Sequence, residues 1–333
     1  MNNVLLVDRI DGKNRMVLRP VEPPALRPKD VLYRVHAIGM NRADLLYLEG
    51  NHYTSTILPS RVGYEACGIV TAVGDEVTEY RAGDRVCALP FGDPLYSTAG
   101  EYAITPANYL VGWPRDFTAA EAAASWMQYL TSYMPLKEVA DISEKDVVLI
   151  TAASSSAGLG GLQLARHLGA TVVATTRTIA KRDALLNAGA HHVVVTEQGD
   201  VAQEILDATG GRGVTVAYDP VAGRSIFDYA QALAKNARIF VYGVLSSPEF
   251  SAPIVDLVRI GAHIHIHSLI NYMPNLEIVA RAKSYLLSAM ESGELRPIID
   301  RIYPFEDFEE AYDYMRSGNQ FGKLVLETRF VER

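Results

Sequence analysis

The sequence has few cysteines, no long apolar run and no excess of basic residues. Only Cys67 and Cys87 occur among 333 residues, which excludes a disulfide framework and a Cys-x-x-Cys metal knuckle. No stretch approaches the roughly 18 apolar residues of a membrane span, and the apolar part of the opening MNNVLLVDRIDGKNR is too short for a signal peptide. Two thiols suit a reducing compartment, so we expect a soluble, cytoplasmic protein.

The charge balance argues against a nucleic-acid partner. Lysine and arginine number 31 against 39 aspartates and glutamates, giving a net charge of −8, whereas a nucleic-acid surface needs a basic face. The densest basic cluster, Arg177, Lys181 and Arg182, is too small for a nucleic-acid groove. What the chain does have is an apolar content of 49%, enough for two domains with sizeable cores.

The character of the sequence changes near residue 120. Before it, short β-type segments are separated by Gly, Pro and Asp turns, which predicts a compact β-rich barrel or sandwich. The predicted strands are Val4–Val7, Val31–Ile38, Gly68–Val73, Arg85–Leu89 and Glu101–Thr105.

After residue 120, short apolar runs alternate with segments of helical spacing, which predicts a parallel sheet buried on both faces. The predicted strands are Val147–Thr151, Thr171–Thr175, His192–Val195, Val214–Asp219, Arg238–Tyr242 and His263–Leu269. The tail is mixed. We expect helices at Leu276–Met290 and Glu306–Met315, an extended segment at LRPIIDRIYPF and a last strand at GKLVLET.

The loop after Val147–Thr151 raises the question of function, because a dinucleotide-binding loop belongs there. Such loops aim backbone N–H groups and a helix N-terminus at a pyrophosphate. Here the loop reads AASSSAG, with serines Ser154, Ser155 and Ser156 followed by Ala157 and Gly158. A hydroxyl can donate to a phosphate or cap the helix. The loop alone therefore fits a cofactor site and an ordinary cap equally well.

The end of the next predicted strand favours the cofactor interpretation. It lacks the acidic residue that would bind a ribose 2′-hydroxyl and carries Thr176, Arg177 and Lys181 instead. Hydroxyl and cationic groups suit a 2′-phosphate, so the pattern predicts NADP(H) rather than NAD(H). The alternative is a solvated helix start that happens to be charged.

Seven stretches in order resemble the medium-chain dehydrogenase/reductase superfamily, specifically its zinc-independent quinone oxidoreductase and enoyl reductase branch. They are GMNRADLLYLEGNHY, VGYEACGIVTAVG, GDRV, YLTSYMPL, AASSSAGLGGLQLA, YDPVAG and FGKLVLE, and they cover nearly the whole chain. The branch uses an A-x-x-G-x-x-G loop, matched by Ala152, Ser155 and Gly158.

The resemblance implies an α/β fold: a Rossmann doubly wound parallel sheet plus a GroES-like β-rich catalytic domain. It places the catalytic domain at residues 1–123 and 271–333 and the NADP(H)-binding domain at 124–270.

The resemblance also implies which residues bind NADPH. Lys181 falls on the 2′-phosphate position, and the nicotinamide end is assigned to Asn41, Thr131, Tyr242, Gly243 and Val244, with Gly322 and Lys323 from the returning C-terminal segment. Some relatives place a tyrosine near position 196 against the adenosine phosphate, whereas this chain has Thr196. We therefore expect the preference for NADPH to depend more on Arg177 and Lys181.

Zinc-dependent relatives carry ligands at positions that here read Asn41, Tyr64 and, less securely, Met127, none of them a good zinc ligand. We therefore expect no catalytic metal. His263, His265 and His267 alternate along a predicted strand and could form a metal site. An edge strand that pairs with its twin in a homodimer is the favoured alternative, through the segment His263–Leu269.

Without a Lewis acid, an acceptor that already has an electron sink is favoured: a quinone or an α,β-unsaturated carbonyl. The protein must then supply a proton donor. Tyr53, in GNHYTS, is the first candidate, with Tyr64 next and Tyr47 and His52 as pocket residues. Asn41 and Asp44 fit a structural turn equally well.

The predicted activity is an NADPH-dependent reductase of apolar or aromatic carbonyl substrates. The alternatives are an NADPH-binding structural or sensor protein and a zinc-type alcohol dehydrogenase.

Overall fold

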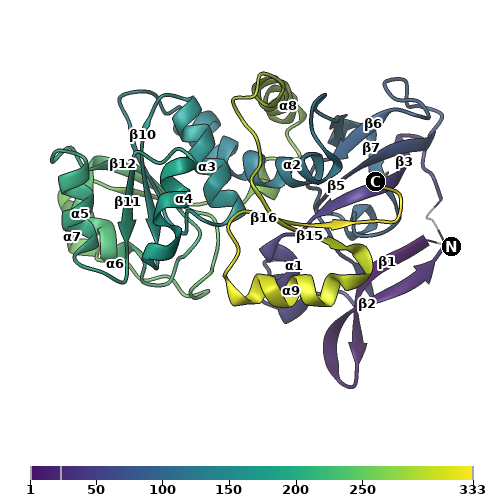
Figure 1. Cartoon of the computed structure of the whole chain (residues 1–333), viewed down its shortest axis with the longest axis horizontal. Helices are drawn as coiled ribbons and strands as arrows, with labels where there is room; N and C mark the ends of the chain where they lie inside the picture. The colour runs from purple at the N-terminus through teal and green to yellow at the C-terminus, as the bar shows by residue number, and fades with distance from the viewer. Residues whose placement is uncertain (1, 23–24, 332–333) are drawn as a thin grey trace. The chain divides into compact units, whose positions relative to one another are not determined.

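The computed structural model describes residues 2–22 and 25–331, and the chain divides into two units (Figure 1). Unit 1 comprises Met1–Met127 and Met273–Arg333, and unit 2 comprises Gln128–Tyr272. Each unit has its own cluster of buried apolar side chains. Within the described part of the chain, no helix is both long and apolar enough to cross a membrane.

Unit 1 is built on two β-sheets. One has the strand order β2 (Lys13–Val21), β1 (Asn2–Ile10), β4 (Ser60–Arg61). The other has the order β15 (Ile299–Pro304), β16 (Lys323–Glu327), β3 (Asp30–Gly39), β5 (Glu65–Val73), β6 (Arg85–Ala88), β8 (Leu110–Gly112), and β7 (Tyr102–Pro106) also pairs with β3. Strand β16 comes from the end of the chain and pairs antiparallel with β3, so the sheet joins both ends of the sequence (Figure 1).

Alternation along the strands explains the core of unit 1. Leu5 and Val7 of β1 and Tyr33 and Val35 of β3 are fully buried, as expected for side chains two residues apart on one face. Three helices, α1 (Arg42–Glu49), α8 (Leu276–Glu291) and α9 (Phe308–Ser317), belong to this unit, and α9 packs on β15 and β16.

Unit 2 is a six-stranded parallel sheet, which confirms the predicted doubly wound arrangement. Its order is β11 (His192–Val195), β10 (Thr171–Thr176), β9 (Val147–Ile150), β12 (Val214–Asp219), β13 (Leu233–Val241), β14 (His263–Ile266). The crossovers contain α3 (Ser156–His167), α4 (Arg182–Asn187), α5 (Val201–Ala208), α6 (Ile226–Tyr229) and α7 (Ile254–Ile260). The strand order reverses between β9 and β12, and ligands of such sheets bind at this reversal, outside the carboxyl ends of the strands.

Several elements differ from the sequence prediction. Strand β2 was not expected, because four of its nine residues are charged or amide side chains and most are at least partly exposed. Helix α2 (Ala119–Tyr133), which contributes residues to both units, was also missed, since its apolar residues surround the helix and leave no periodic stripe. Strand β14 ends at Ile266 rather than Leu269, and a 3₁₀ turn (Leu269–Asn271) follows.

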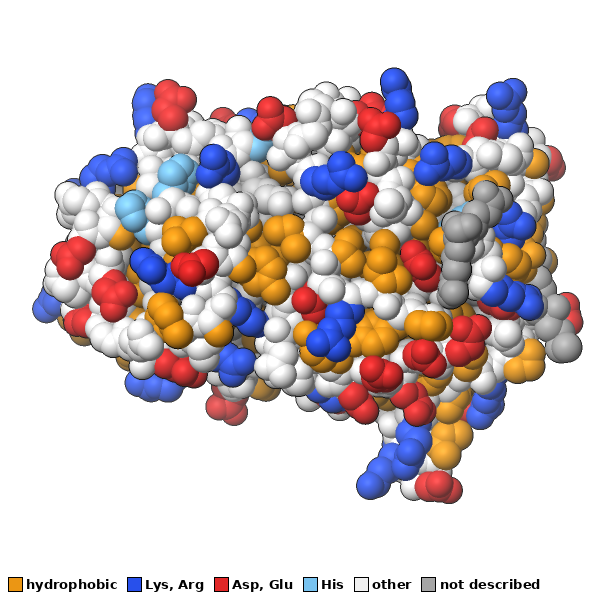
Figure 2. Space-filling view, viewed as in Figure 1, with side chains coloured by type: hydrophobic (Ala, Val, Ile, Leu, Met, Phe, Trp, Pro, Cys, Tyr) orange, Lys and Arg blue, Asp and Glu red, His pale blue; other side chains and the backbone are white. Residues whose placement is uncertain are grey.

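The surface carries mixed charge. Among the described residues on the face shown in Figure 2, acidic and basic side chains are interspersed, with no broad basic patch. On this face, the described side chains therefore form no continuous positive surface that nucleic acid could follow.

Candidate functional site

The serine-rich loop connects β9 to α3 at the reversal of the strand order in unit 2. Ser155 is the N-cap of α3, and its hydroxyl oxygen accepts a hydrogen bond of 3.1 Å from the Gly158 N–H. The hydroxyl proton of Ser155 is thus not used by this cap. The first N–H groups of a helix have no intrahelical partner and, with the helix dipole, favour an anion at this end.

Gly158 is required by close packing. A Cβ built on it would lie 2.7 Å from the Ala152 carbonyl oxygen and 2.8 Å from the Ala153 Cα, distances that real Cβ atoms do not adopt. Ala152 itself has a φ of +47°, which bends the chain sharply after β9. Gly158 is therefore a position of this loop where a side chain would force a shift, whereas Ser155 already carries a side chain at the helix N-cap.

Cationic groups lie beside this loop. Lys181, at the end of a 3₁₀ turn that follows β10, donates a hydrogen bond of 3.4 Å to Ser154 Oγ. Arg177 directly follows β10 and is exposed, whereas Thr176 is buried at the strand end. The structure thus brings the Lys181 ammonium to the serine loop from 27 residues away. A pyrophosphate on the loop and a further phosphate near Lys181 both fit this charge distribution.

The end of β12 is organised by a carboxylate that the sequence analysis did not single out. Asp219 is fully buried and accepts hydrogen bonds from Thr151 Oγ1, the Val221 N–H, Ser225 Oγ and Tyr229 Oη, at 2.6–2.8 Å. These bonds join β9 to the turn that follows β12. A buried acid with every oxygen satisfied is a structural anchor, and its only sequence signal was its place in YDPVAG.

Tyr242, Gly243 and Val244 follow β13 in the same unit. Tyr242 is half-buried and stacks on Tyr218 with ring centroids 3.9 Å apart, and its N–H donates to the Asp219 carbonyl. Val244 is half-buried against the core of this unit. Thr131, in α2, is also buried and belongs to unit 2.

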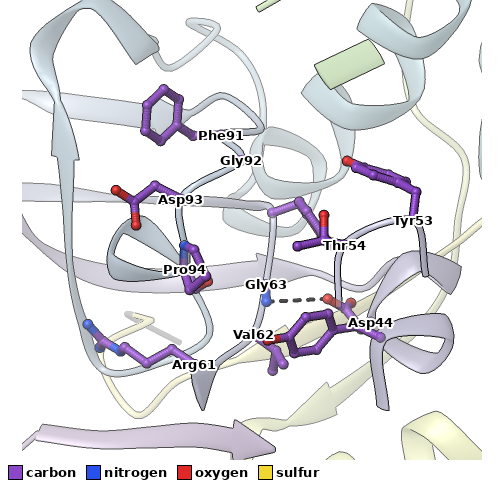
Figure 3. Close-up of a pocket in the computed structure, with 13 residues that line it drawn as sticks. Asp44, Tyr53, Thr54, Arg61, Val62, Gly63, Phe91, Gly92, Asp93 and Pro94 are labelled. Atoms are coloured by element: carbon purple, nitrogen blue, oxygen red, sulfur yellow. Dashed lines mark hydrogen bonds between the residues drawn. The ribbon is translucent and has the colours of Figure 1, made fainter. Parts of the chain in front are cut away.

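A pocket opens in unit 1 beside α1, β4 and the turns that follow them (Figure 3). Tyr53 lies on one side of it and Phe91, Asp93 and Arg61 on the other. The remaining lining residues are Asp44, Tyr47, Thr54, Val62, Gly63, Tyr64, Gly92, Pro94 and Ser97. The pocket thus combines aromatic walls with a few polar groups, as small-molecule sites do.

Asp44 anchors the floor of this pocket. Its carboxylate accepts hydrogen bonds from the Asn41 and Gly63 N–H groups and from Tyr312 Oη, and the Gly63 bond is drawn in Figure 3. Burial raises the pKa of Asp44 to about 6, although these hydrogen bonds and the nearby Lys323 charge act in the opposite direction. This geometry matches the structural turn considered for Asn41 and Asp44.

The predicted donors differ in their surroundings. Tyr53 is 63% exposed, and its ring lies against the His52 ring in a tilted arrangement with centroids 4.0 Å apart. Tyr64 is half-buried, and its hydroxyl lies 3.3 Å from His52 Nε2. Tyr47 is buried and bonds Ser60 Oγ at 2.9 Å.

Asn41 and Lys323 belong to one buried polar cluster with Glu65, another residue that the sequence analysis missed. Lys323 Nζ donates to Asn41 Oδ1 at 2.8 Å and contacts Glu65 Oε1, and Asn41 Nδ2 donates to the Gly39 carbonyl and to Glu65. The other Glu65 oxygen accepts from the Met127 N–H. Gly322, at φ +110°, turns the chain into this cluster.

These residues do not fit a zinc ion. The three positions that hold zinc in metal-dependent relatives carry an amide, a phenol and a thioether in Asn41, Tyr64 and Met127, and the Asn41 oxygen already binds an ammonium. A divalent cation beside that positive charge would be repelled. In the part of the chain that the structure describes, no group of three His, Cys, Asp or Glu side chains is placed to hold a metal.

Packing accounts for two of the three histidines in and after β14, and the third, His263, is exposed. His265 stacks on Phe240 with ring centroids 4.9 Å apart, and buried His267 lies against Tyr272. Burial lowers the pKa of His267 to about 4. The exposed face of the strand is apolar, with Ile266 75% exposed.

Comparisons with known proteins agree with this geometry. Residues 27–133 match the family model described as "Alcohol dehydrogenase GroES-like domain", and residues 157–277 match "Zinc-binding dehydrogenase". Quinone oxidoreductase 1 of Escherichia coli is 30% identical over 93% of this chain and 95% of its own length. The rat synaptic vesicle membrane protein VAT-1 homolog is 28% identical over 94% of this chain and 80% of its own. The crystal structure of E. coli quinone oxidoreductase complexed with NADPH superposes with a TM-score of 0.87 at 25% identity, covering 98% of this chain and all of that one.

Proposed function

Because the chain belongs to the medium-chain dehydrogenase/reductase superfamily, in its quinone oxidoreductase, VAT-1 and enoyl reductase branch, we propose that it is an NADPH-dependent reductase of quinones or α,β-unsaturated carbonyl compounds. The observation that carries the proposal is the serine loop before Gly158, with Lys181 bonded to Ser154 at its edge. A loop of this kind at the reversal of a parallel sheet suits a dinucleotide, and the cations suit the additional phosphate.

The residues proposed to hold NADPH fall into two groups. Ser154, Ser155, Ser156, Ala157 and Gly158 face the pyrophosphate, with Thr176, Arg177 and Lys181 at the 2′-phosphate. The nicotinamide end is assigned to Asn41, Thr131, Tyr242, Gly243, Val244, Gly322 and Lys323. Bound NADPH supplies a hydride. Asn41 is proposed to act as a fixed amide, held by Lys323 and Glu65.

The chemistry follows from the residues of the pocket in unit 1. Since Asn41, Tyr64 and Met127 do not fit a zinc ion, the acceptor itself must contain an electron sink, as quinones and enones do. The protein orients the acceptor, excludes water and gives a proton to the oxygen on which charge develops. Tyr53 and Tyr64 both line this pocket and are the candidate donors. Aromatic walls favour an apolar or aromatic substrate.

The proposal is tested by anaerobic mixing of the protein with NADPH and a panel of quinones and enones. We expect NADPH oxidation well above the rate without protein for at least one acceptor. With deuterium on the transferred position of NADPH, alkene reduction places the label on the β-carbon, whereas quinone reduction leaves no carbon label. Tight NADPH binding without oxidation by any acceptor would instead favour a binding or sensor protein.

We also propose that the protein is a cytoplasmic homodimer that pairs through β14. The support is the position of β14 at the edge of the parallel sheet and the exposed apolar side chains of β14 and α7: Ile254, Val255, Val258 and Ile266 are each more than 60% exposed. An unprotected apolar edge strand is an aggregation hazard unless a partner covers it. The free, buried Cys67 and Cys87 are consistent with a reducing compartment.

A further inference from the structure

His52 lies directly behind the pocket wall, and one backbone contact fixes where its proton sits. The Thr54 N–H donates a hydrogen bond of 3.2 Å to His52 Nδ1. A backbone N–H can only donate, so Nδ1 must present its lone pair, and the proton of the neutral ring is on Nε2. Burial lowers the pKa of His52, which favours this neutral form.

The tautomer of His52 decides the direction of its bond to Tyr64. The Tyr64 hydroxyl lies 3.3 Å from Nε2. Because Nε2 carries the proton, His52 donates and the Tyr64 oxygen accepts. The hydroxyl proton of Tyr64 therefore remains for another acceptor, and no second hydrogen-bond partner of this hydroxyl occurs among residues 2–22 and 25–331. Burial also raises the pKa of Tyr64, so the phenol is protonated at neutral pH.

Two other polar groups of the same pocket, the Tyr47 hydroxyl and the Asp44 carboxylate, are already engaged. The Tyr47 hydroxyl bonds Ser60 Oγ at 2.9 Å and accepts from the Ile57 N–H at 2.9 Å. The Asp44 carboxylate is held by three donors. Tyr53 is largely exposed and covers the His52 ring. Tyr64 is therefore the half-buried pocket phenol with a proton available to a ligand.

We propose that Tyr64 is the proton donor to the acceptor oxygen and that His52 is a positioning residue, which turns the Tyr64 proton toward the pocket through its Nε2–H. This inference rests on the proposed reductase function. The acceptor gains a hydride, NADPH is oxidised to NADP⁺, and the resulting oxyanion takes the Tyr64 proton as the phenolic O–H bond breaks. The Nε2–H of His52 stabilises the phenolate until water returns a proton to it.

The first test compares single-hydroxyl deletions with the fastest quinone or enone of the panel. We expect Tyr64→Phe to lower kcat by about 100-fold, the lower range for loss of a general acid, with KM changed less than about threefold. Tyr80→Phe is the matched control, because Tyr80 packs against the core of unit 1 outside the pocket. Unaltered kcat in Tyr64→Phe would overturn the proposal, as would a loss confined to Tyr53→Phe.

His52 is tested by a pair of variants that differ in one donor. His52→Gln retains an N–H that can reach Tyr64, whereas His52→Leu does not. We expect His52→Leu to lower kcat about tenfold, equivalent to about one hydrogen bond, and His52→Gln to recover most of it. Equal losses in the two variants would show a packing role only and would overturn the positioning role.

A binding measurement separates this inference from the proposed function. p-Nitrophenolate carries an aromatic oxyanion and reports its own binding by an absorbance shift. We expect Tyr64→Phe to weaken its binding about tenfold relative to both the wild type and Tyr80→Phe, whether or not any acceptor is reduced. If the wild type oxidises NADPH but Tyr64→Phe matches it in both assays, the inference fails alone. If no acceptor is reduced while the Tyr64 effect on binding persists, the reductase function fails and the proton transfer fails with it, but Tyr64 remains a hydrogen-bond donor to a ligand oxyanion.

Discussion

Lys323 Nζ donates a hydrogen bond of 2.8 Å to Asn41 Oδ1, although the two residues are 282 positions apart in the chain. The bond joins the last strand of unit 1 to the N-cap of α1. The same ammonium contacts Glu65 Oε1, and both charged side chains are only 1% exposed. The ion pair therefore ties together the two distant parts of the sequence that form unit 1.

Removing one partner of this pair should be costly. We expect Lys323→Met to lower the free energy of unfolding by about 3–5 kcal/mol, because Glu65 is left as an uncompensated buried charge. Urea denaturation measures the change. The double variant Lys323→Met/Glu65→Gln should recover much of the loss, whereas Lys29→Met, which breaks an exposed pair with Glu76, should change little. A full loss in the double variant would argue against charge as the cause.

The close contact at Gly158 predicts a specific binding defect. Gly158→Ala places a methyl group against the Ala152 carbonyl, so the loop must shift. We expect NADPH affinity to fall at least about tenfold, or about 1.4 kcal/mol, with a stability loss of about 1–3 kcal/mol. Isothermal calorimetry measures the affinity. Gly112→Ala, with no atom within 4 Å of its added Cβ, is the control, and equal affinities in the two variants would refute the role of the loop.

The two cations beside the loop predict coenzyme preference. We expect Lys181→Met and Arg177→Met each to weaken NADPH binding about tenfold, because each removes a charged partner of the 2′-phosphate. NADH binding should be unchanged, since NADH lacks that group. Fluorescence titration with both coenzymes provides the comparison, and Arg182→Met serves as a nearby cationic control. Parallel losses for NADPH and NADH would contradict the assignment.

The raised pKa of Asp44 predicts a pH dependence of stability. The unfolded carboxyl titrates near its ordinary value of 3.8 and the folded one at about 6, so between these values the folded state binds the additional proton. The stability that this group contributes is therefore present below about pH 4 and is lost as pH rises through 6. We expect the wild type to lose up to about 3 kcal/mol relative to Asp44→Asn over that window. Urea denaturation across the range checks it, and a constant difference would contradict it.

The edge strand predicts a change in assembly. Ile266→Lys places a charge on the exposed face of β14, where strand pairing would bury it. We expect sedimentation velocity to show a dimer for the wild type and a monomer for Ile266→Lys. Ile302→Lys, at a half-exposed position in unit 1, should leave the assembly unchanged. A wild-type monomer would remove the proposed interface.

The sequence predicted most reliably the elements that are apolar on both sides. Strands β11 and β12 have the predicted bounds, because continuous apolar runs between turns leave little ambiguity. Strand β2 was missed because an exposed antiparallel strand tolerates charge on both of its faces. The contact of Tyr312 with Asp44 spans 268 residues, and no local pattern could have revealed it. Likewise, the sequence named His52 and Tyr64 separately, but only the Thr54 contact gives their bond a direction.

The pairing of β16 with β3 has a consequence for synthesis on the ribosome. The 145 residues of unit 2 are contiguous, whereas the largest sheet of unit 1 needs a strand that starts at Lys323. Translation therefore delivers all of unit 2 from the exit tunnel before it delivers β16. Unit 2 can thus acquire its native contacts during translation, while β3 must wait for the synthesis of β16 before its neighbour arrives. A nascent chain stalled after unit 2 has emerged and before β16 is made should therefore protect unit 2 from protease and leave unit 1 open to cleavage.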